Sequence, residues 1–180
     1  MGNRKKEKSY SQLNNEQNII LNRKLIIKRI LWTAAAVMWM AVIFSFSSQN
    51  AEQTTQLSTG TLNTLKSFFK NIWLIREILE LKNAEIIIRK LGHICEYAIL
   101  GLLLYRMYSL YLSSEYKKVI FISIITGFLY AVSDEFHQRF VSGRSGQFKD
   151  VCIDTAGIAA AMAVVIIVNK IKKRKNKSDC

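Results

Sequence analysis

Polar and ionisable side chains gather at the ends of three apolar runs of this chain. They follow helical spacing within each run, and in chain order they are Lys90, His93, Glu96 and Tyr97, then Asp134, Glu135, His137 and Gln138, then Asp150 and Asp154. Side chains three or four residues apart share one face of a helix, so each set can point toward a common site. Ionisable residues within apolar helices usually face a bundle interior or a watery cavity.

One chemistry that suits these residues is an intramembrane enzyme, a hydrolase or group transferase acting on a lipid-linked substrate. His93 could act as general acid or base, and Arg144 could stabilise the charge that develops on a phosphate. The catalytic candidates are His93, Glu96, Asp134, Glu135, Arg144 and Asp150. Against catalysis, no nucleophile motif is present, since Ser133 lacks the glycines of a nucleophile elbow.

A divalent metal ion would belong to the same enzyme hypothesis. The candidate ligands are His93, Glu96, Asp134 and Glu135. No cofactor is expected, because an isolated His-x-x-Glu pair is a weak signal and the acidic residues match no metal-binding loop.

The competing hypothesis is a binding site that breaks no bond. Cationic side chains would hold a phosphate or carboxylate group, and the acidic residues would order them. The ligand-binding candidates are Lys90, His93, Tyr97, Gln138, Arg139, Arg144 and Asp154. A third interpretation is a buried ion-pair network, joining Arg144 or Arg139 to acidic residues, that only holds helices together. A transporter has less support, because the polar residues gather at one end of the helices rather than at their middle.

The elements that must position these residues are apolar helices. Four segments have the length and composition of membrane spans, at about residues 30–46, 92–112, 118–136 and 150–168. The stretch from Val119 to Val132 has no polar stripe of the kind that a soluble amphipathic helix shows. The sequence therefore predicts an all-α fold, a polytopic transmembrane bundle with about four spans.

The basic residues predict the orientation of this bundle. The formal net charge is +13, and with four spans one side of the membrane receives 17 Lys and Arg and the other receives 9. Positive charge favours the cytoplasm, so both termini are expected there and the polar sets at the outer face. The basic tail has no interleaved aromatic residue and no nucleic-acid motif, so no nucleic-acid partner is expected.

Three further segments complete the predicted organisation. Residues 1–29 and 170–180 are basic cytoplasmic tails, and residues 47–90 form an outer loop. Apolar residues at helical spacing within this loop, with lysines beside them, predict one interfacial helix over about residues 62–80.

A family resemblance rests on the same polar residues. The segments KLGHICEYAILG and YAVSDEFHQRFVSGRSGQFKDVCIDTAG, with FSFSSQ after the first span, resemble the VanZ-like family of small bacterial membrane proteins over about residues 39–157. By position the resemblance points to Lys90, His93, Glu96, Tyr97, Asp134, Glu135, Gln138, Arg144 and Asp150. Ser142 stands where the family commonly has proline, and Asp154 stands where asparagine is common.

The resemblance implies a multi-pass protein of the cell membrane, with residues 30–169 as its VanZ-like domain. The family's namesake is associated with resistance to teicoplanin, a lipoglycopeptide that acts on peptidoglycan precursors at the outer face of the membrane. The implied role is thus to lower susceptibility to such antibiotics in the envelope of a Gram-positive cell. The implied partners are membrane lipids and either a lipid-linked cell-wall precursor or the lipoglycopeptide.

Overall fold

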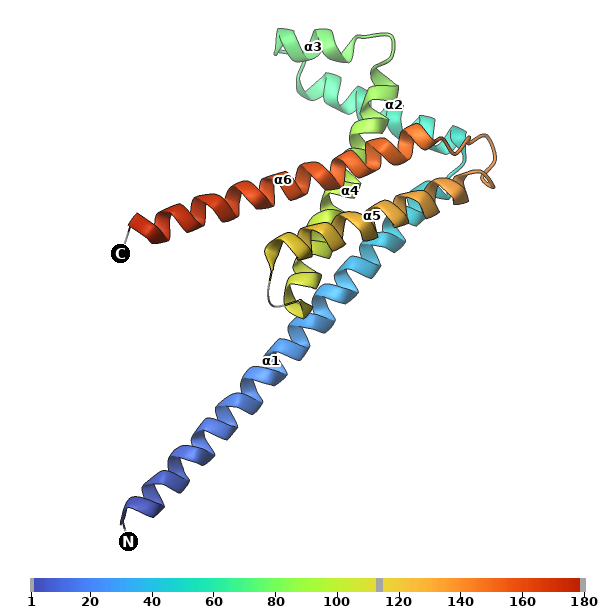
Figure 1. Ribbon diagram of the computed structural model, residues 1–180. Helices are drawn as coiled ribbons and strands as arrows, with labels where there is room; N and C mark the ends of the chain where they lie inside the picture. Colours follow the sequence, from blue (N-terminus) through green and yellow to red (C-terminus); the bar gives the residue numbers. More distant parts are fainter. Residues whose placement is uncertain (1, 113–114, 179–180) are drawn as a thin grey trace.

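The computed structural model describes residues 2–112 and 115–178. This part of the chain forms six helices and no strand (Figure 1), which confirms the all-helical prediction. The helices are α1 Gly2–Ser47, α2 Ala51–Phe68, α3 Trp73–Leu79, α4 Ala84–Tyr111, α5 Tyr116–Gln138 and α6 Phe148–Ser178.

Three helices in the described part are long and apolar enough to cross a membrane: Glu16–Ser47 in α1, Tyr116–Gln138 in α5 and Phe148–Asn176 in α6. At 1.5 Å per residue even the shortest, α5, is about 34 Å long, enough for a hydrocarbon core of about 30 Å. Large apolar side chains such as Phe121, Leu129 and Val164 are exposed on their outer sides. Three helices of this length and composition, with apolar side chains exposed on their surfaces, indicate a membrane protein.

Helix α4 is not among these three, so the fourth span remains a prediction. It packs against α1, α2, α5 and α6. It also runs antiparallel to α1, since Trp39 Nε1 donates to the Glu96 carbonyl (2.9 Å) and Arg29 Nε donates to the Leu110 carbonyl (3.0 Å). Helix α4 therefore leads away from the end of α1 and returns the chain to the start of α5.

Close helix contact stabilises the centre of the bundle. Ile43, Tyr97, Leu100 and Ile158 are completely buried there. Gly157 of α6 lies directly against the backbone of Ile94 in α4, leaving no room for a side chain. Small residues allow helices in membranes to approach in this way, and here they hold the polar ends of α4 and α6 at a fixed distance.

The structure corrects the prediction for the outer loop, residues 47–90. Instead of one helix over about 62–80, it contains α2 and α3 with a turn between them. Helix α2 begins in the polar run because Asn50 and Gln53 form a reciprocal capping box, with bonds of 2.8 and 3.1 Å. Several of its hydroxyls, including those of Thr55 and Thr59, donate to carbonyls four residues earlier in the helix.

Helix α1 covers both the predicted tail and the predicted first span. It continues without a break through residue 30, where the sequence predicts the boundary between tail and span. No proline or glycine after Gly2 interrupts it, so nothing in the local sequence ends the helix before Ser47.

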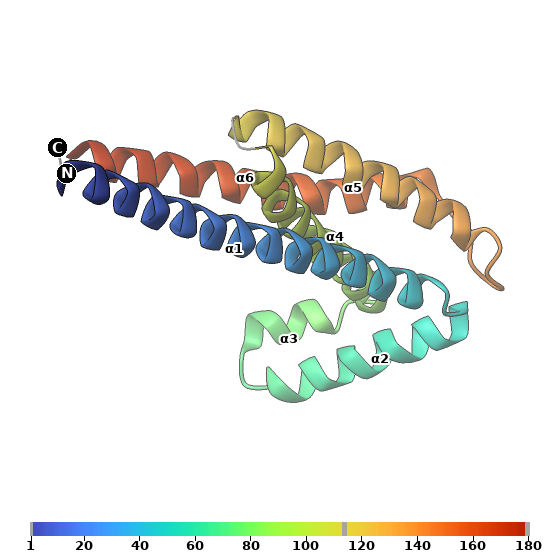
Figure 2. The same ribbon diagram turned by 90° about the horizontal axis from the view of Figure 1, so that it is seen from below.

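The ends of α1 and α5 and the start of α6 meet at one end of the bundle (Figures 1 and 2). Helix α2 leaves this end and lies against α4. The connection between α5 and α6 lies at the same end, where Ala51 N donates to the Ser142 carbonyl (3.4 Å). Three polar sets that are far apart in sequence are thus brought to one place.

Candidate functional site

A buried hydrogen-bond network joins the ends of α1 and α5. Ser47 Oγ donates to Asp134 Oδ2 at 2.6 Å, and Gln138 Nε2 lies 3.3 Å from the same oxygen and 3.4 Å from Ser47 Oγ. All three side chains are buried. Asp134 and Gln138 are one helical turn apart, as their spacing predicts, so both reach the end of α1.

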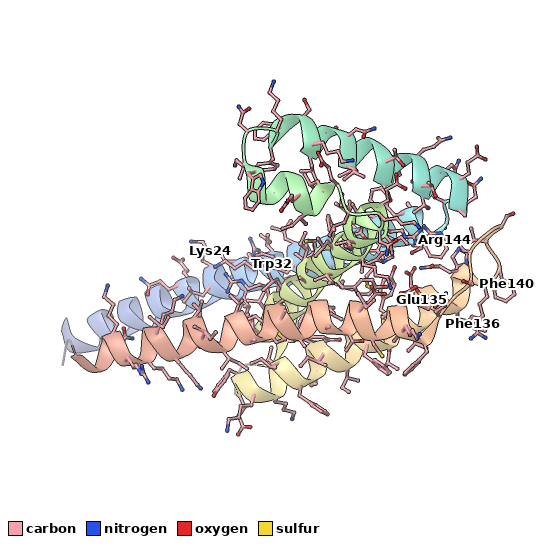
Figure 3. All side chains as sticks on the ribbon, turned by 90° about the horizontal axis from the view of Figure 1, so that it is seen from above. Lys24, Trp32, Glu135, Phe136, Phe140 and Arg144 are labelled. Atoms are coloured by element: carbon pink, nitrogen blue, oxygen red, sulfur yellow. The ribbon has the colours of Figure 1, made fainter. Side chains whose placement is uncertain are left out.

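Arg144, from the connection between α5 and α6, joins this network to α2. Its Nη1 donates to the Ser47 carbonyl (3.2 Å) and its Nη2 to Thr54 Oγ1 (2.6 Å). Burial lowers the pKa of Arg144 from its usual value, and the nearby charge of Arg89 lowers it further. An arginine still keeps its proton at neutral pH. The guanidinium is therefore a half-buried cation whose direct hydrogen-bond acceptors are neutral, while the more distant charges of Asp134, Glu135 and Glu96 partly oppose the fall in its pKa. Figure 3 shows Arg144 at this end of the bundle, near Glu135.

A tight turn aims Arg144 inward. Gly143 has a φ of 76°, the left-handed conformation that glycine adopts most readily. Arg144 N donates to the Val141 carbonyl (3.1 Å) and closes the turn. The Gly-Arg pair in the sequence thus has a structural reason, and the turn forms with Ser142 in place of proline.

Two contacts between α4 and α6 complete the site. Lys90 Nζ lies 3.2 Å from Asp150 Oδ1, and His93 Nδ1 lies 3.5 Å from Asp154 Oδ1. The first pair is partly exposed, whereas Asp154 is 1% exposed. The ion-pair alternative stays a prediction: in the described part of the chain Asp150 pairs with Lys90 and the direct partners of Arg144 are neutral, while the contacts of Lys90 with Asp150 and of His93 with Asp154 join α4 to α6.

These elements enclose a cavity of about 250 Å³. Its polar lining includes Arg89, Lys90, His93, Gln138, Arg144, Gln147, Asp150 and Asp154. Among the described residues, Arg89 has no ion pair or hydrogen bond from its side chain. The cavity therefore contains one exposed cationic side chain, Arg89, without a direct polar partner in the described part of the chain, beside the acidic side chains of Asp150 and Asp154.

Glu135 closes the opposite side of the connection between α5 and α6. Its Oε2 accepts a hydrogen bond from Gln147 N (2.9 Å), and its side chain is buried. Phe136 and Phe140 point outward from the same end of α5 (Figure 3). Glu135 thus stabilises the connection between α5 and α6 and does not line the cavity.

Several buried polar atoms near the cavity have no hydrogen-bond partner among the described residues. They are His93 Nδ1, Tyr97 Oη, Asp134 Oδ1, Glu135 Oε1 and both carboxylate oxygens of Asp154. Buried polar groups in proteins are normally satisfied, so unmatched groups beside a cavity point to water or a ligand. We therefore expect His93 and Asp154, which both line the cavity, to contact water or a ligand there.

The four metal candidates do not converge. No group of three or more His, Cys, Asp or Glu side chains within residues 2–112 and 115–178 is arranged to hold a metal ion. His93 lines the cavity and Glu96 a neighbouring groove, whereas Asp134 belongs to the hydrogen-bond network and Glu135 contacts Gln147.

Five of the seven predicted ligand-binding residues line the cavity: Lys90, His93, Gln138, Arg144 and Asp154. Tyr97 is completely buried beneath them. Arg139 lies outside, in a separate groove between α5 and α6. Sequence reasoning missed Arg89, Ser47 and Thr54. Arg89 directly precedes Lys90, and Ser47 lies in the FSFSSQ segment that carries the family resemblance. Thr54 had no such signal, because its role depends on a contact with Arg144, 90 positions away.

The fold and the cavity define an all-helical membrane protein with a polar site at one end of its bundle. The model of the VanZ/LLP1 family matches residues 32–169. The chain belongs to this family, as its polar motifs indicated. No curated protein and no solved structure gives a significant match.

Proposed function

We propose that the cavity binds the anionic headgroup of a membrane lipid or lipid-linked cell-wall precursor at the outer face of the cell membrane. Binding there would lower the susceptibility of a Gram-positive cell to teicoplanin-type antibiotics. The observation that carries this proposal is the state of two arginines that line the cavity. Among the described residues Arg89 has no polar partner and Arg144 has only neutral ones.

Phosphate is the headgroup chemistry that these residues suit best. Arginine presents a planar set of donors that matches phosphate oxygens, and such charge-assisted bonds are stronger than neutral ones. Lys90 lies at the same cavity and is partly exposed, so it can turn from Asp150 to an incoming anion. The half-buried position of Arg144 strengthens its attraction for an anion, because water screens the charge less there.

A second candidate function is catalysis on the bound lipid. The supporting observation is that His93 Nδ1 lies 3.5 Å from Oδ1 of the buried Asp154 at the cavity wall, close enough for an ion pair when the histidine is protonated. A carboxylate that orients a histidine is a common arrangement for moving a proton to or from a ligand. This candidate predicts a chemically altered lipid after incubation with the purified protein. Asp154→Asn would abolish that product while leaving lipid binding in place.

The test of the binding proposal compares teicoplanin susceptibility in a sensitive Gram-positive host that expresses wild type, Arg89→Gln or Arg139→Gln at matched membrane levels. Arg89 has no partner in the fold, so its replacement leaves the bundle intact. Arg139 is the matched control, because it is an exposed arginine outside the cavity. We expect protection by wild type and Arg139→Gln and its loss in Arg89→Gln. Equal protection by all three, or none from wild type, would reject the proposal.

A further inference from the structure

A second hollow adjoins the cavity and opens between α2 and α4. Its volume is about 300 Å³. It shares Arg89, His93 and Arg144 with the cavity, so these side chains border both spaces. We call it the α2–α4 groove. The cavity and the α2–α4 groove therefore meet at the side chains of Arg89 and Arg144.

The α2–α4 groove changes character along its length. Near Arg144 its walls are polar, with the hydroxyls of Thr54 and Ser58. Elsewhere the apolar side chains of Phe46, Leu57 and Ile88 line it, together with the polar side chains of Gln49, Thr61 and Glu96. Phe46 and Leu57 are each about half exposed (45% and 52%), so their side chains are accessible from the groove. An apolar path therefore leads away from the cationic cavity.

Gly92 is an open position in this groove. A Cβ atom built there would meet nothing within 4 Å. Gly92 thus leaves a space along α4 that a side chain would fill, one turn from Ile88 and next to His93.

We infer that the ligand is an amphiphile with a phosphate group, whose phosphate lies in the cavity and whose alkyl chain lies in the α2–α4 groove. This inference rests on the proposed headgroup site and adds the class of molecule. A soluble phosphate compound would use the cavity alone and would leave the apolar groove empty. A lipid phosphate matches both the charge at one end and the apolar walls at the other.

The groove between α5 and α6 is the competing path for a chain. It is lined by Val132, Phe136, Phe148 and Val151 and has a volume of about 180 Å³. It shares only Gln147 with the cavity, and the hydrogen bond from Gln147 N to Glu135 Oε2 lies between the two spaces. The α2–α4 groove, which shares three residues, is the continuous route.

The test uses Gly92→Leu, with Gly60→Leu as its matched control. Gly60 lies on α2 in another surface hollow, which borders the groove at Gln49, Leu57 and Thr61 but shares no residue with the cavity, and a Cβ there also meets nothing within 4 Å. The backbone therefore leaves room for a Cβ at both positions, and only Gly92 lines the α2–α4 groove itself. Arg89→Gln serves as the headgroup variant. The full-length proteins are placed in nanodiscs of phosphatidylcholine.

Two probes separate the chain from the headgroup. Binding of hexadecyl phosphate is measured by native mass spectrometry, and binding of methyl phosphate by ³¹P NMR titration. Filling an occupied space forces strain or displacement, so we expect Gly92→Leu to weaken hexadecyl phosphate binding by about tenfold or more. Methyl phosphate binding should change by less than about twofold, since the cavity is untouched. Gly60→Leu should change neither.

Each other outcome is decisive. Unchanged hexadecyl phosphate binding in Gly92→Leu, together with its loss in Arg89→Gln, would overturn the groove and leave the headgroup site standing. An equal loss of both probes in Gly92→Leu would overturn it as well, because the effect would not depend on the chain. Unchanged binding of both probes in Arg89→Gln would overturn the headgroup site and the groove together.

Discussion

Ser47 and Asp134 are 87 residues apart in sequence and share a buried hydrogen bond of 2.6 Å. Ser47 is the last residue of α1, and its carbonyl also accepts a hydrogen bond from Arg144. One serine thus links the end of α1 to α5 through its side chain and to the following connection through its backbone. Two residues that line the cavity, Gln138 and Arg144, both contact this serine.

The first prediction concerns the free energy of unfolding. Ser47→Ala leaves the buried Asp134 carboxylate without its shortest hydrogen bond, which typically costs about 1–3 kcal/mol. Thermal unfolding in detergent micelles, followed by circular dichroism, would show a lower Tm. Ser45→Ala is the control, because Ser45 is exposed and bonds only to Ala41 of its own helix. Equal Tm values for the two variants would contradict the role of the link.

The second prediction concerns the contact between α4 and α6. In Gly157→Ala the added methyl group meets the backbone of Ile94, so the helices must separate. We expect a loss of about 1–3 kcal/mol, typical of overpacking. Gly92→Ala, on the open side of α4, should be neutral or gain up to about 1 kcal/mol from helix propensity. Chemical denaturation of both variants would measure the difference, and similar stabilities would exclude a tight contact at Gly157.

The third prediction separates stability from binding at Lys90. Its contact with Asp150 is partly exposed, with side-chain exposures of 43% and 34%. Pairs of this kind contribute less than about 1 kcal/mol. Lys90→Gln should therefore leave Tm almost unchanged and weaken hexadecyl phosphate binding several-fold. A large fall in Tm would instead assign the pair a structural role.

The fourth prediction concerns the attachment of α2. Thr54→Val preserves the shape of the side chain and removes the oxygen that accepts from Arg144 Nη2. Without this bond the start of α2 should open more often, so its amide protons should exchange faster with deuterium. Thr55→Val is the control, since Thr55 is exposed and bonds only within its helix. Unchanged exchange in Thr54→Val would show that Arg144 does not restrain α2.

The fifth prediction tests the orientation in the membrane. The three native cysteines are first replaced by serine, and single cysteines are then placed at Ser145, which lines the cavity, or at Lys172, near the other end of α6. If the cavity faces outward, an impermeant thiol reagent should label the first variant on intact cells and the second only after lysis. The reverse pattern would place the cavity in the cytoplasm and reject an outer-face role.

The sequence by itself determined the helical fold, the family and most of the polar site. Apolar runs and helical spacing are local properties, so they showed which residues share a face in α4, α5 and α6. In the structure Asp134 and Gln138 lie on one face of α5, and Asp150 and Asp154 lie on one face of α6, as their spacing predicts. The Gly143–Arg144 turn was also visible, because its conformation depends on adjacent residues.

Only the tertiary structure decided how these faces combine. Ser47 and Thr54 gained their roles through contacts with residues about 90 positions away, which no local pattern records. Arg139 and Arg144 are both arginines of one short connection, yet only Arg144 turns into the cavity. The polar run before residue 62 begins as a helix at the capping box of Asn50 and Gln53, and its hydroxyls, such as those of Thr55 and Thr59, find acceptors within the same helix. Packing of distant helix ends, rather than residue type, selected which charges form the site.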